Sequence, residues 1–343
     1  MQRLVHLGIF VCAVACVPNV DVELWRVDEP RLLAIRTEPA EAAPGDLIDV
    51  TALYAGADGT IDAPEIDWAF CTARRPLAEL GPVAPSCLEE EDRSLVRLGR
   101  GESVSGRVPV DTCRLFGPDP PPSEPGQPSG RPVDPDITGG YFQPLIARSE
   151  DAELSLFRMR IACGLAKATQ RQAAEYRRRY QRNAAPRVDS VAHMVEGSAN
   201  ELNLDAPLVV RVGERVDLRV RWPACSPESV CGDGFCTLDE TAETCAGDCE
   251  GQARGCGGAE TYLLFEPSAL ELVLRRESIS LAWFTNDGAF EVARTGRAPD
   301  ELEAWSDNVW VAPDEPGTAT LWIVVRDDRG GASWTQIEAE VFR

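Results

Sequence analysis

The twelve cysteines of this chain constrain its fold more than any other feature of the sequence. Half of them crowd into residues 225–256, a segment too small and polar to bury enough apolar surface to fold without cross-links. Three disulfides are therefore expected within this segment, and the sequence leaves fifteen pairings open. The six residues are Cys225, Cys231, Cys236, Cys245, Cys249 and Cys256.

The first fifteen residues have the pattern of an export signal. Arg3 precedes an apolar run, and Ala13 and Ala15 are the small residues typical of a cleavage site. The run is too short to span a bilayer, which needs about 20 apolar residues. We therefore expect residues 1–15 to be removed and the remaining cysteines to oxidise outside the cytoplasm.

The tetrapeptide Ala13-Val14-Ala15-Cys16 resembles the lipobox of bacterial lipoproteins. The resemblance implies a diacylglycerol on the thiol of Cys16, and an outer-membrane lipoprotein of the cell envelope that faces the periplasm or the exterior. The alternative is an ordinary signal peptidase that cuts at the same bond and releases a soluble protein. The cysteine count favours the lipid. Cys12 leaves with the signal, and acylation of Cys16 leaves ten cysteines, which can all pair.

The net charge of −22 excludes nucleic acid and anionic headgroups as general partners, because an acidic surface repels them. His193 is the only imidazole outside the signal, and we expect it at a strand edge or a domain interface. Nucleophile-elbow, zinc-protease, phosphate-loop and dinucleotide motifs are absent from the sequence. We therefore expect no enzyme, and a carboxylate pair acting as a glycoside hydrolase is the catalytic alternative.

Residues 31–163 are predicted to form one β-sandwich, because short strand-like runs are separated by glycine and proline. Residues 16–30 are expected to be a tether to the membrane. The proline-rich residues 117–136 predict a loop, with a polyproline ligand as the alternative. Two disulfides are expected to cross-link this sandwich, Cys71 with Cys87 and Cys113 with Cys163.

Residues 164–185 are expected to form a basic helical linker. Tyr176 and Tyr180 share one side of the helix, while several arginines face another way. One hypothesis is that the arginines contact membrane phosphates or an acidic partner. The other is that the tyrosines pack at a domain junction and the arginines pair with carboxylates of the chain itself.

Residues 186–343 are predicted to form a second sandwich. The fold class expected is therefore all-β, with two immunoglobulin-like sandwiches, a short connecting helix and a disulfide-rich insertion in the second domain. The motifs Leu281-Ala282-Trp283-Phe284 and Trp310-Val311-Ala312-Pro313-Asp314 resemble bacterial immunoglobulin-like domains of the PKD and cadherin-like sort. This resemblance implies a fold and is almost silent on function.

Within the insertion, Cys231-Gly232-Asp233-Gly234-Phe235-Cys236 resembles a cysteine-rich repeat of exported bacterial proteins, present here in one copy. Acidic residues near it supply the hard oxygen ligands that calcium prefers, although their spacing differs from an EF-hand and solvated side chains are the alternative. Zinc is less favoured, because the cysteine spacing misses the paired C-x-x-C pattern. The candidate calcium ligands are Asp233, Asp239, Glu240 and Asp248.

Together these features predict an envelope-anchored lipoprotein that acts as a non-catalytic scaffold, adhesion or binding module for a protein or glycan ligand. No cofactor is expected apart from the candidate calcium. The alternative is a carbohydrate-binding lipoprotein. Trp305 lies between polar residues and is the candidate stacking platform for a sugar ring.

Overall fold

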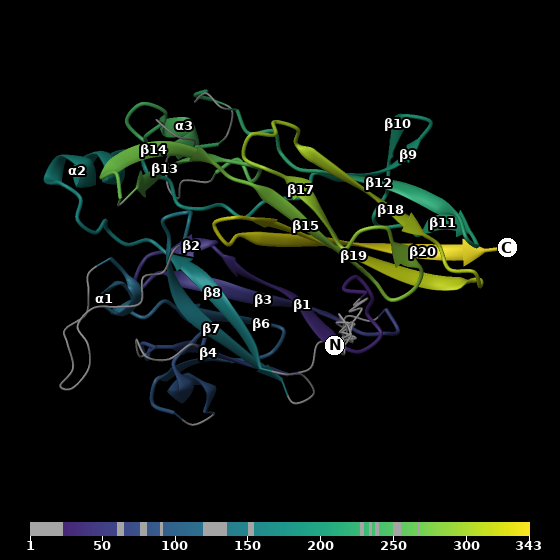
Figure 1. Cartoon of the computed structure of the whole chain (residues 1–343), viewed down its shortest axis with the longest axis horizontal. Helices are drawn as coiled ribbons and strands as arrows, with labels where there is room; N and C mark the ends of the chain where they lie inside the picture. Colours follow the sequence, from purple (N-terminus) through teal and green to yellow (C-terminus); the bar gives the residue numbers. More distant parts are fainter. Residues whose placement is uncertain are drawn as a thin grey trace, which may run out of the picture.

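The fold consists of two β-sandwiches that lie against each other, with a smaller lobe at one end of the second (Figure 1). It is described from a computed structural model. The ranges described are 23–59, 65–75, 81–89, 92–118, 136–149, 154–226, 230–232, 235–236, 240–249, 255–266 and 268–343.

The first sandwich pairs a three-stranded sheet with a five-stranded sheet. Trp68 and Phe70 are fully buried between them, because alternate residues of a strand point to one face. The three-stranded order is β1 (Arg31–Glu38), β3 (Leu47–Ala55), β6 (Ser103–Arg107). The five-stranded order is β2 (Glu41–Ala42), β8 (Ser155–Ile161), β7 (Tyr141–Ser149), β4 (Ile66–Cys71), β5 (Leu95–Arg100), with two short helices, η1 (Pro85–Leu88) and α1 (Thr112–Phe116), between strands.

The second sandwich contains two five-stranded sheets around a core that includes the buried Trp283 and Trp310. One sheet has the order β10 (Ser198–Glu201), β9 (Ser190–Val195), β12 (Arg215–Arg221), β18 (Trp305–Val311), β16 (Ala289–Phe290). The other has the order β11 (Leu208–Arg211), β20 (Ala332–Phe342), β19 (Gly317–Asp327), β15 (Ile279–Thr285), β17 (Arg294–Arg297).

Strand β19 is buried on both faces, and this places the two sandwiches. Leu321 and Ile323 point into the core of the second sandwich, whereas Trp322 and Val324 pack against the first. Their contacts there come from β1 and β3, chiefly Leu33 and other apolar side chains. An alternating strand normally has one polar face, so two apolar faces indicate burial between two layers.

The linker helix α2 (Gln170–Arg179) is shorter than the range predicted from the sequence. It begins after Thr169, whose hydroxyl accepts a hydrogen bond from the backbone N–H of Gln172, while the Gln172 side chain accepts one from the backbone N–H of Thr169. The helix lies beside a separate hairpin of β13 (Thr261–Glu266) and β14 (Glu271–Arg276). Within the described ranges, no helix is long and apolar enough to cross a membrane.

The described part of the predicted tether packs on the second sandwich. The backbone N–H of Val27 donates to the Thr285 carbonyl at 2.8 Å, and the N–H of Thr285 donates to the Trp25 carbonyl at 2.9 Å. Val27 is buried in the contact between the sandwiches. Residues 23–30 are therefore attached to the second sandwich, and a tether from residues 16–30 to a membrane stays a prediction. Residues 16–22 and most of the proline-rich segment, 119–135, lie outside the described ranges.

The chain is thus all-β in class, with two immunoglobulin-like sandwiches, a short linker helix and a disulfide-rich lobe in its C-terminal half, as the sequence predicts. Five disulfides cross-link it. Disulfides in such number form and persist in oxidising compartments, so the protein matures outside the cytoplasm.

Candidate functional site

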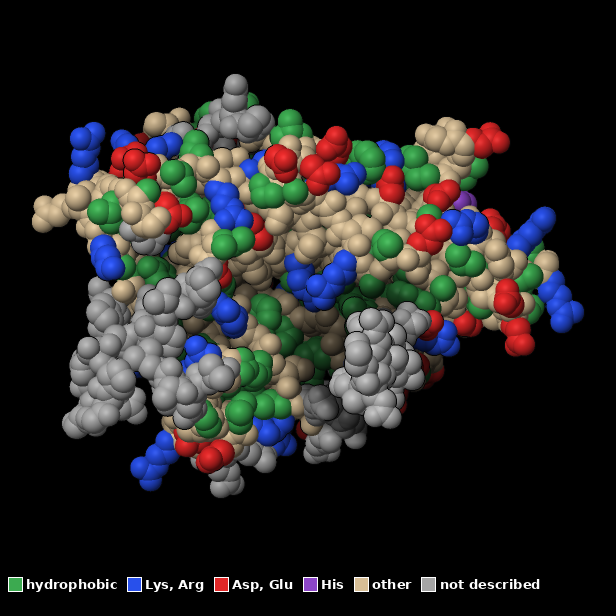
Figure 2. Space-filling view, viewed as in Figure 1, with side chains coloured by type: hydrophobic (Ala, Val, Ile, Leu, Met, Phe, Trp, Pro, Cys, Tyr) green, Lys and Arg blue, Asp and Glu red, His purple; other side chains and the backbone are tan. Residues whose placement is uncertain are grey.

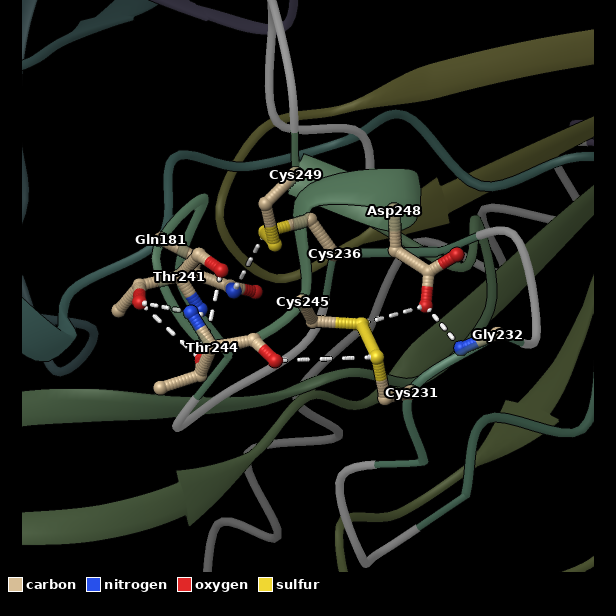
Figure 3. Close-up of a disulfide and its surroundings, with 9 residues drawn as sticks. All are labelled: Gln181, Cys231, Gly232, Cys236, Thr241, Thr244, Cys245, Asp248 and Cys249. Carbon is tan, nitrogen blue, oxygen red and sulfur yellow. Dashed lines mark hydrogen bonds between the residues drawn. A yellow bond between two sulfur atoms is a disulfide. The ribbon is translucent and has the colours of Figure 1, made fainter.

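Every cysteine after Cys16 is paired. The first sandwich contains the two disulfides expected from the sequence, Cys71 with Cys87 and Cys113 with Cys163. In the lobe, one of the fifteen open pairings is realised, and the central pairs interleave along the chain (Figure 3). The lobe pairs are Cys225–Cys256, Cys231–Cys245 and Cys236–Cys249.

The lobe is folded by cross-links and local polar contacts. Asp248, at the end of the short helix α3 (Ala246–Cys249), accepts a hydrogen bond from the backbone N–H of Gly232 at 2.5 Å (Figure 3). The Thr241 hydroxyl accepts a hydrogen bond from the backbone N–H of Thr244 at 3.1 Å, and the Thr244 hydroxyl accepts one from the backbone N–H of Thr241 at 2.9 Å. The side chains that are buried among the described residues of the lobe are mainly disulfide cysteines.

The candidate calcium ligands do not converge among the described residues. Asp233 and Asp239 lie outside the described ranges. Glu240 and Asp248 fall in two different groups of close ligand atoms, and the other members of both groups are disulfide sulfurs. A disulfide sulfur lacks the thiolate charge that binds metals, and calcium requires six to eight oxygens. Neither group alone therefore makes a zinc or calcium site, and the calcium prediction, which also involves Asp233 and Asp239, stays a prediction.

The lobe is attached to the linker between the sandwiches. Arg187 donates from its guanidinium to the Cys256 carbonyl at 3.2 Å, and its guanidinium also lies 5.5 Å from the centre of the Phe235 ring. The amide of Gln181 donates to Cys236 Sγ at 3.7 Å. The lobe is thus continuous with the junction of the two sandwiches rather than an isolated appendage.

A buried ionic network lies where the linker meets both sandwiches. Arg329 is fully buried, and its Nε lies 2.5 Å from Glu277 Oε1 while its Nη2 lies 3.1 Å from Glu260 Oε2. Its Nη1 donates to the Gln181 carbonyl at 3.1 Å, and its guanidinium stacks 4.5 Å above Tyr262. One guanidinium therefore connects the second sandwich, the hairpin and the linker.

The same network reaches the first sandwich through Glu41. This buried carboxylate accepts the Tyr180 hydroxyl at 2.7 Å and the Asn183 backbone N–H at 2.9 Å, and it lies 3.3 Å from Arg160 Nε. The Asn183 side chain then donates to both carboxylate oxygens of Asp327, at 3.1 and 3.2 Å. Residues from both sandwiches thus meet on the linker, so the two domains are fixed by hydrogen bonds that water does not reach.

Carboxylates outnumber guanidinium groups in this network, and this changes their ionisation. Burial, and then the charge of Glu277, raises the pKa of Glu260 to about 8. Burial likewise raises the pKa of Glu277, against the opposing effect of Arg329, and it raises the pKa of Asp327. Two acids that share one cation in a dry site retain a proton above their usual range.

The tyrosines and some arginines of the linker contact the chain itself. Tyr176 and Tyr180 stack with ring centres 4.5 Å apart, and the Tyr180 hydroxyl enters the network. Arg179 pairs with Glu175 at 3.1 Å, and Arg182 pairs with Asp46 of the first sandwich at 2.7 Å. These contacts are those that the packing hypothesis predicts, and contact of the other arginines with a membrane or an acidic partner stays a hypothesis.

Trp305 is poorly suited to stack on a sugar. The guanidinium of Arg219 lies 3.7 Å from the centre of its ring, and that of Arg297 lies 4.6 Å away. The side chain is half-buried at the start of β18. His193 is a half-buried residue of β9, opposite Asn200 of β10 and Leu218 of β12, so it lies on an interior strand and not at the predicted sheet edge. Cys16 lies outside the described ranges.

The sequence carries little signal of the ionic network. Arg329 lies in a charged turn, where arginines are usually solvated, and Glu277 follows two arginines at a strand end. Glu41 carried the one signal, because it is a single acid within an alanine-rich, otherwise apolar stretch. The network's carboxylates are bound by guanidinium, amide or hydroxyl donors, so its evident role is to orient the two sandwiches.

No family model and no curated protein matches the sequence. Among solved structures, the Yersinia pseudotuberculosis adhesin InvE aligns at 9% identity and a TM-score of 0.21, over 90% of this chain and 58% of the adhesin. Fibronectin(III)-like modules of Clostridium thermocellum CbhA align at 7% identity and a TM-score of 0.20, over 90% of this chain and 94% of that one. Salmonella alpha-2-macroglobulin aligns at 8% identity and a TM-score of 0.21, over 95% of this chain and 16% of that protein's chain. Such low TM-scores carry no argument about function.

Proposed function

We propose that this protein is a lipoprotein of the bacterial cell envelope that acts as a rigid, non-catalytic binding or scaffold module. The observation that carries the proposal is the complete pairing of the ten cysteines after Cys16. With Cys12 in the signal, Cys16 has no cysteine left to pair with. Acylation of the Cys16 thiol would explain why this cysteine is left unpaired. Two or more acyl chains anchor a protein stably in a membrane.

The non-catalytic part of the proposal rests on the junction. The strongest cluster of ionisable side chains among the described residues is buried and already bound, so it serves orientation rather than turnover. A fixed angle between two sandwiches holds the loops at their ends at constant separation. That property suits a module that presents a binding surface at a distance from the membrane.

The anchor is tested by fractionating bacteria that express the full chain with its own N-terminus. We expect the wild type in the membrane fraction, with a lipid mass on the N-terminal peptide, and Cys16→Ser in the soluble fraction. Cys12→Ser is the matched control and should fractionate like the wild type. Soluble wild-type protein with an unmodified Cys16 would overturn the anchor. Hydrolysis of any member of a polysaccharide panel by purified protein would overturn the non-catalytic role.

A further inference from the structure

A group of arginines lines the junction between the sandwiches, at the opposite side of β19 from the core. Arg36 comes from β1, Arg326 from β19 and Arg294 from β17, and we call these three residues the arginine cleft. Figure 2 shows Lys or Arg side chains beside a hollow between the two domains, with hydrophobic side chains deeper inside. On a protein of net charge −22, such a concentration of positive charge is unexpected.

Strand register places these side chains on one face. Ala282 of β15 lies opposite Arg294 on one side and opposite Val324 on the other, and both Ala282 and Val324 face the first sandwich. Arg326 is two residues from Val324 and therefore shares that face. Its Nη2 donates to the Leu33 carbonyl of β1 at 2.9 Å, which brings it beside the strand that carries Arg36.

The arginine cleft has no counter-charge among the described residues. None of its three guanidinium groups lies within 4.0 Å of a described carboxylate. Burial, and then repulsion from Arg294, lowers the pKa of the half-buried Arg326. Half-buried charges in proteins are normally paired, and the arginines of the ionic network follow that rule. A bound anion would supply the negative charge that the arginine cleft lacks among the described residues.

The aromatic side chains of the junction indicate what kind of anion fits. Arg36 lies over the Trp334 ring at 4.6 Å, and the nearby Arg31 lies over Phe284 at 5.5 Å. Stacking holds the guanidinium plane of Arg36 in place, so its forked N–H groups are available to a carboxylate in a fixed orientation. The same stacking occupies the ring surfaces that a sugar would need. The arginine cleft therefore suits carboxylates better than a carbohydrate.

The charge of the whole protein limits the length of the ligand. A long polyanion that ran beyond the arginine cleft would meet the acidic surface and be repelled by it. A short run of glutamate or aspartate with neutral flanks keeps its charge inside the cleft. We propose that the arginine cleft binds a short acidic segment of a partner protein. This inference rests on the proposed binding role but not on the lipid anchor.

The probe is a fluorescent peptide with three consecutive glutamates between glycines, titrated with the purified full chain at low ionic strength. A peptide with glutamines in place of the glutamates is the matched probe. We expect the glutamate peptide to bind, the glutamine peptide to fail, and added salt to weaken the binding by screening. The same titration on Cys16→Ser protein separates this result from the fate of the anchor.

The arginine cleft is located by variants. Arg326→Gln should weaken binding by about tenfold or more, the loss expected for one charge-assisted contact. Because Arg326 is half-buried, the exposed Arg294→Gln serves as a second variant and should weaken binding without altering the fold. Arg219→Gln is the matched control, since Arg219 stacks on a tryptophan, as Arg36 of the arginine cleft does, but is paired with Asp307.

Three results would overturn the proposal. The first is that neither peptide binds, or that both bind equally. The second is that Arg294→Gln and Arg326→Gln bind the glutamate peptide as tightly as Arg219→Gln does. The third is that a polyuronate binds through the same arginines more tightly than the peptide, which would assign the arginine cleft to an anionic glycan instead.

Discussion

The ionic network and the cysteine-rich lobe touch each other, yet they are held together in opposite ways. In the network, buried charges are matched by hydrogen bonds that come from distant parts of the sequence. In the lobe, three covalent bonds close short loops, and the buried side chains among its described residues are mainly those of disulfide cysteines. The first depends on the global fold and on protonation, and the second depends on local chain closure and on redox state. Each should therefore fail under different conditions and over a different extent of the molecule.

The largest effect expected is from removing the central cation of the network. Arg329→Met leaves Glu277 and Glu260 buried without their guanidinium, which destabilises a protein by about 3–5 kcal/mol. In urea denaturation, the midpoint of the whole unfolding transition should fall, because both sandwiches depend on the junction. Arg215→Met removes an exposed cation paired with Glu291 and should leave the urea midpoint unchanged. Equal midpoints for the two variants would remove the contrast between network and surface.

Removal of a lobe disulfide should destabilise the lobe by a comparable free energy, but the effect should be confined to the lobe. Cys236 and Cys249 are 13 residues apart, and closing a loop of that size is worth about 3 kcal/mol on the chain-entropy model. In the Cys236→Ser/Cys249→Ser double variant, we expect rapid proteolysis within residues 225–256. The main thermal transition of the sandwiches should stay close to that of the wild type. A large fall in that transition would mean that the lobe supports the junction and that the two regions do not fail independently.

A change of pH should alter the stability of the ionic network but not that of the lobe, and this effect should be smaller than the two above. The pKa of Glu260 is raised to about 8 in the folded state, from an ordinary value of 4.5, so the folded protein holds a proton that the unfolded chain releases. Its contribution to stability is therefore complete below pH 4.5 and is lost as the pH rises towards 8, by about 2 kcal/mol after allowance for coupling to its neighbours.

This loss is measured as the fall in urea midpoint between pH 5 and pH 9. Glu277→Gln keeps a neutral side chain of the same shape beside Arg329 and should flatten the pH dependence. Glu291→Gln, at the surface pair with Arg215, should not. Proteolysis of the lobe should show no such pH dependence beyond that of the protease itself. A midpoint that rises with pH would contradict the raised pKa of the network.

Local patterns accounted for most of the architecture. Alternation in Leu47–Ala55 predicted a half-buried strand, and β3 occupies that range. The two disulfides of the first sandwich could be paired because only four cysteines remain outside the predicted signal, Cys16 and the lobe. The lobe pairing could not be ranked, because several connectivities close loops of similar length. The contribution of Trp25 and Val27 to the second sandwich also escaped prediction, because a short segment without periodicity carries no signal of what it packs against.

What the sequence by itself determined about this protein is its class: exported, oxidised, all-β and built from two sandwiches with a cross-linked lobe. These properties follow from composition, from spacing and from the period of two, which act over a few residues at a time. Only the tertiary structure decided that Glu41, Arg160 and Arg329 join one network, while Arg36, Arg294 and Arg326 lie at the junction with no described carboxylate within 4.0 Å. An arginine has the same side chain in either setting, and its role depends on which distant groups the fold brings within a few ångströms and on how much water it removes.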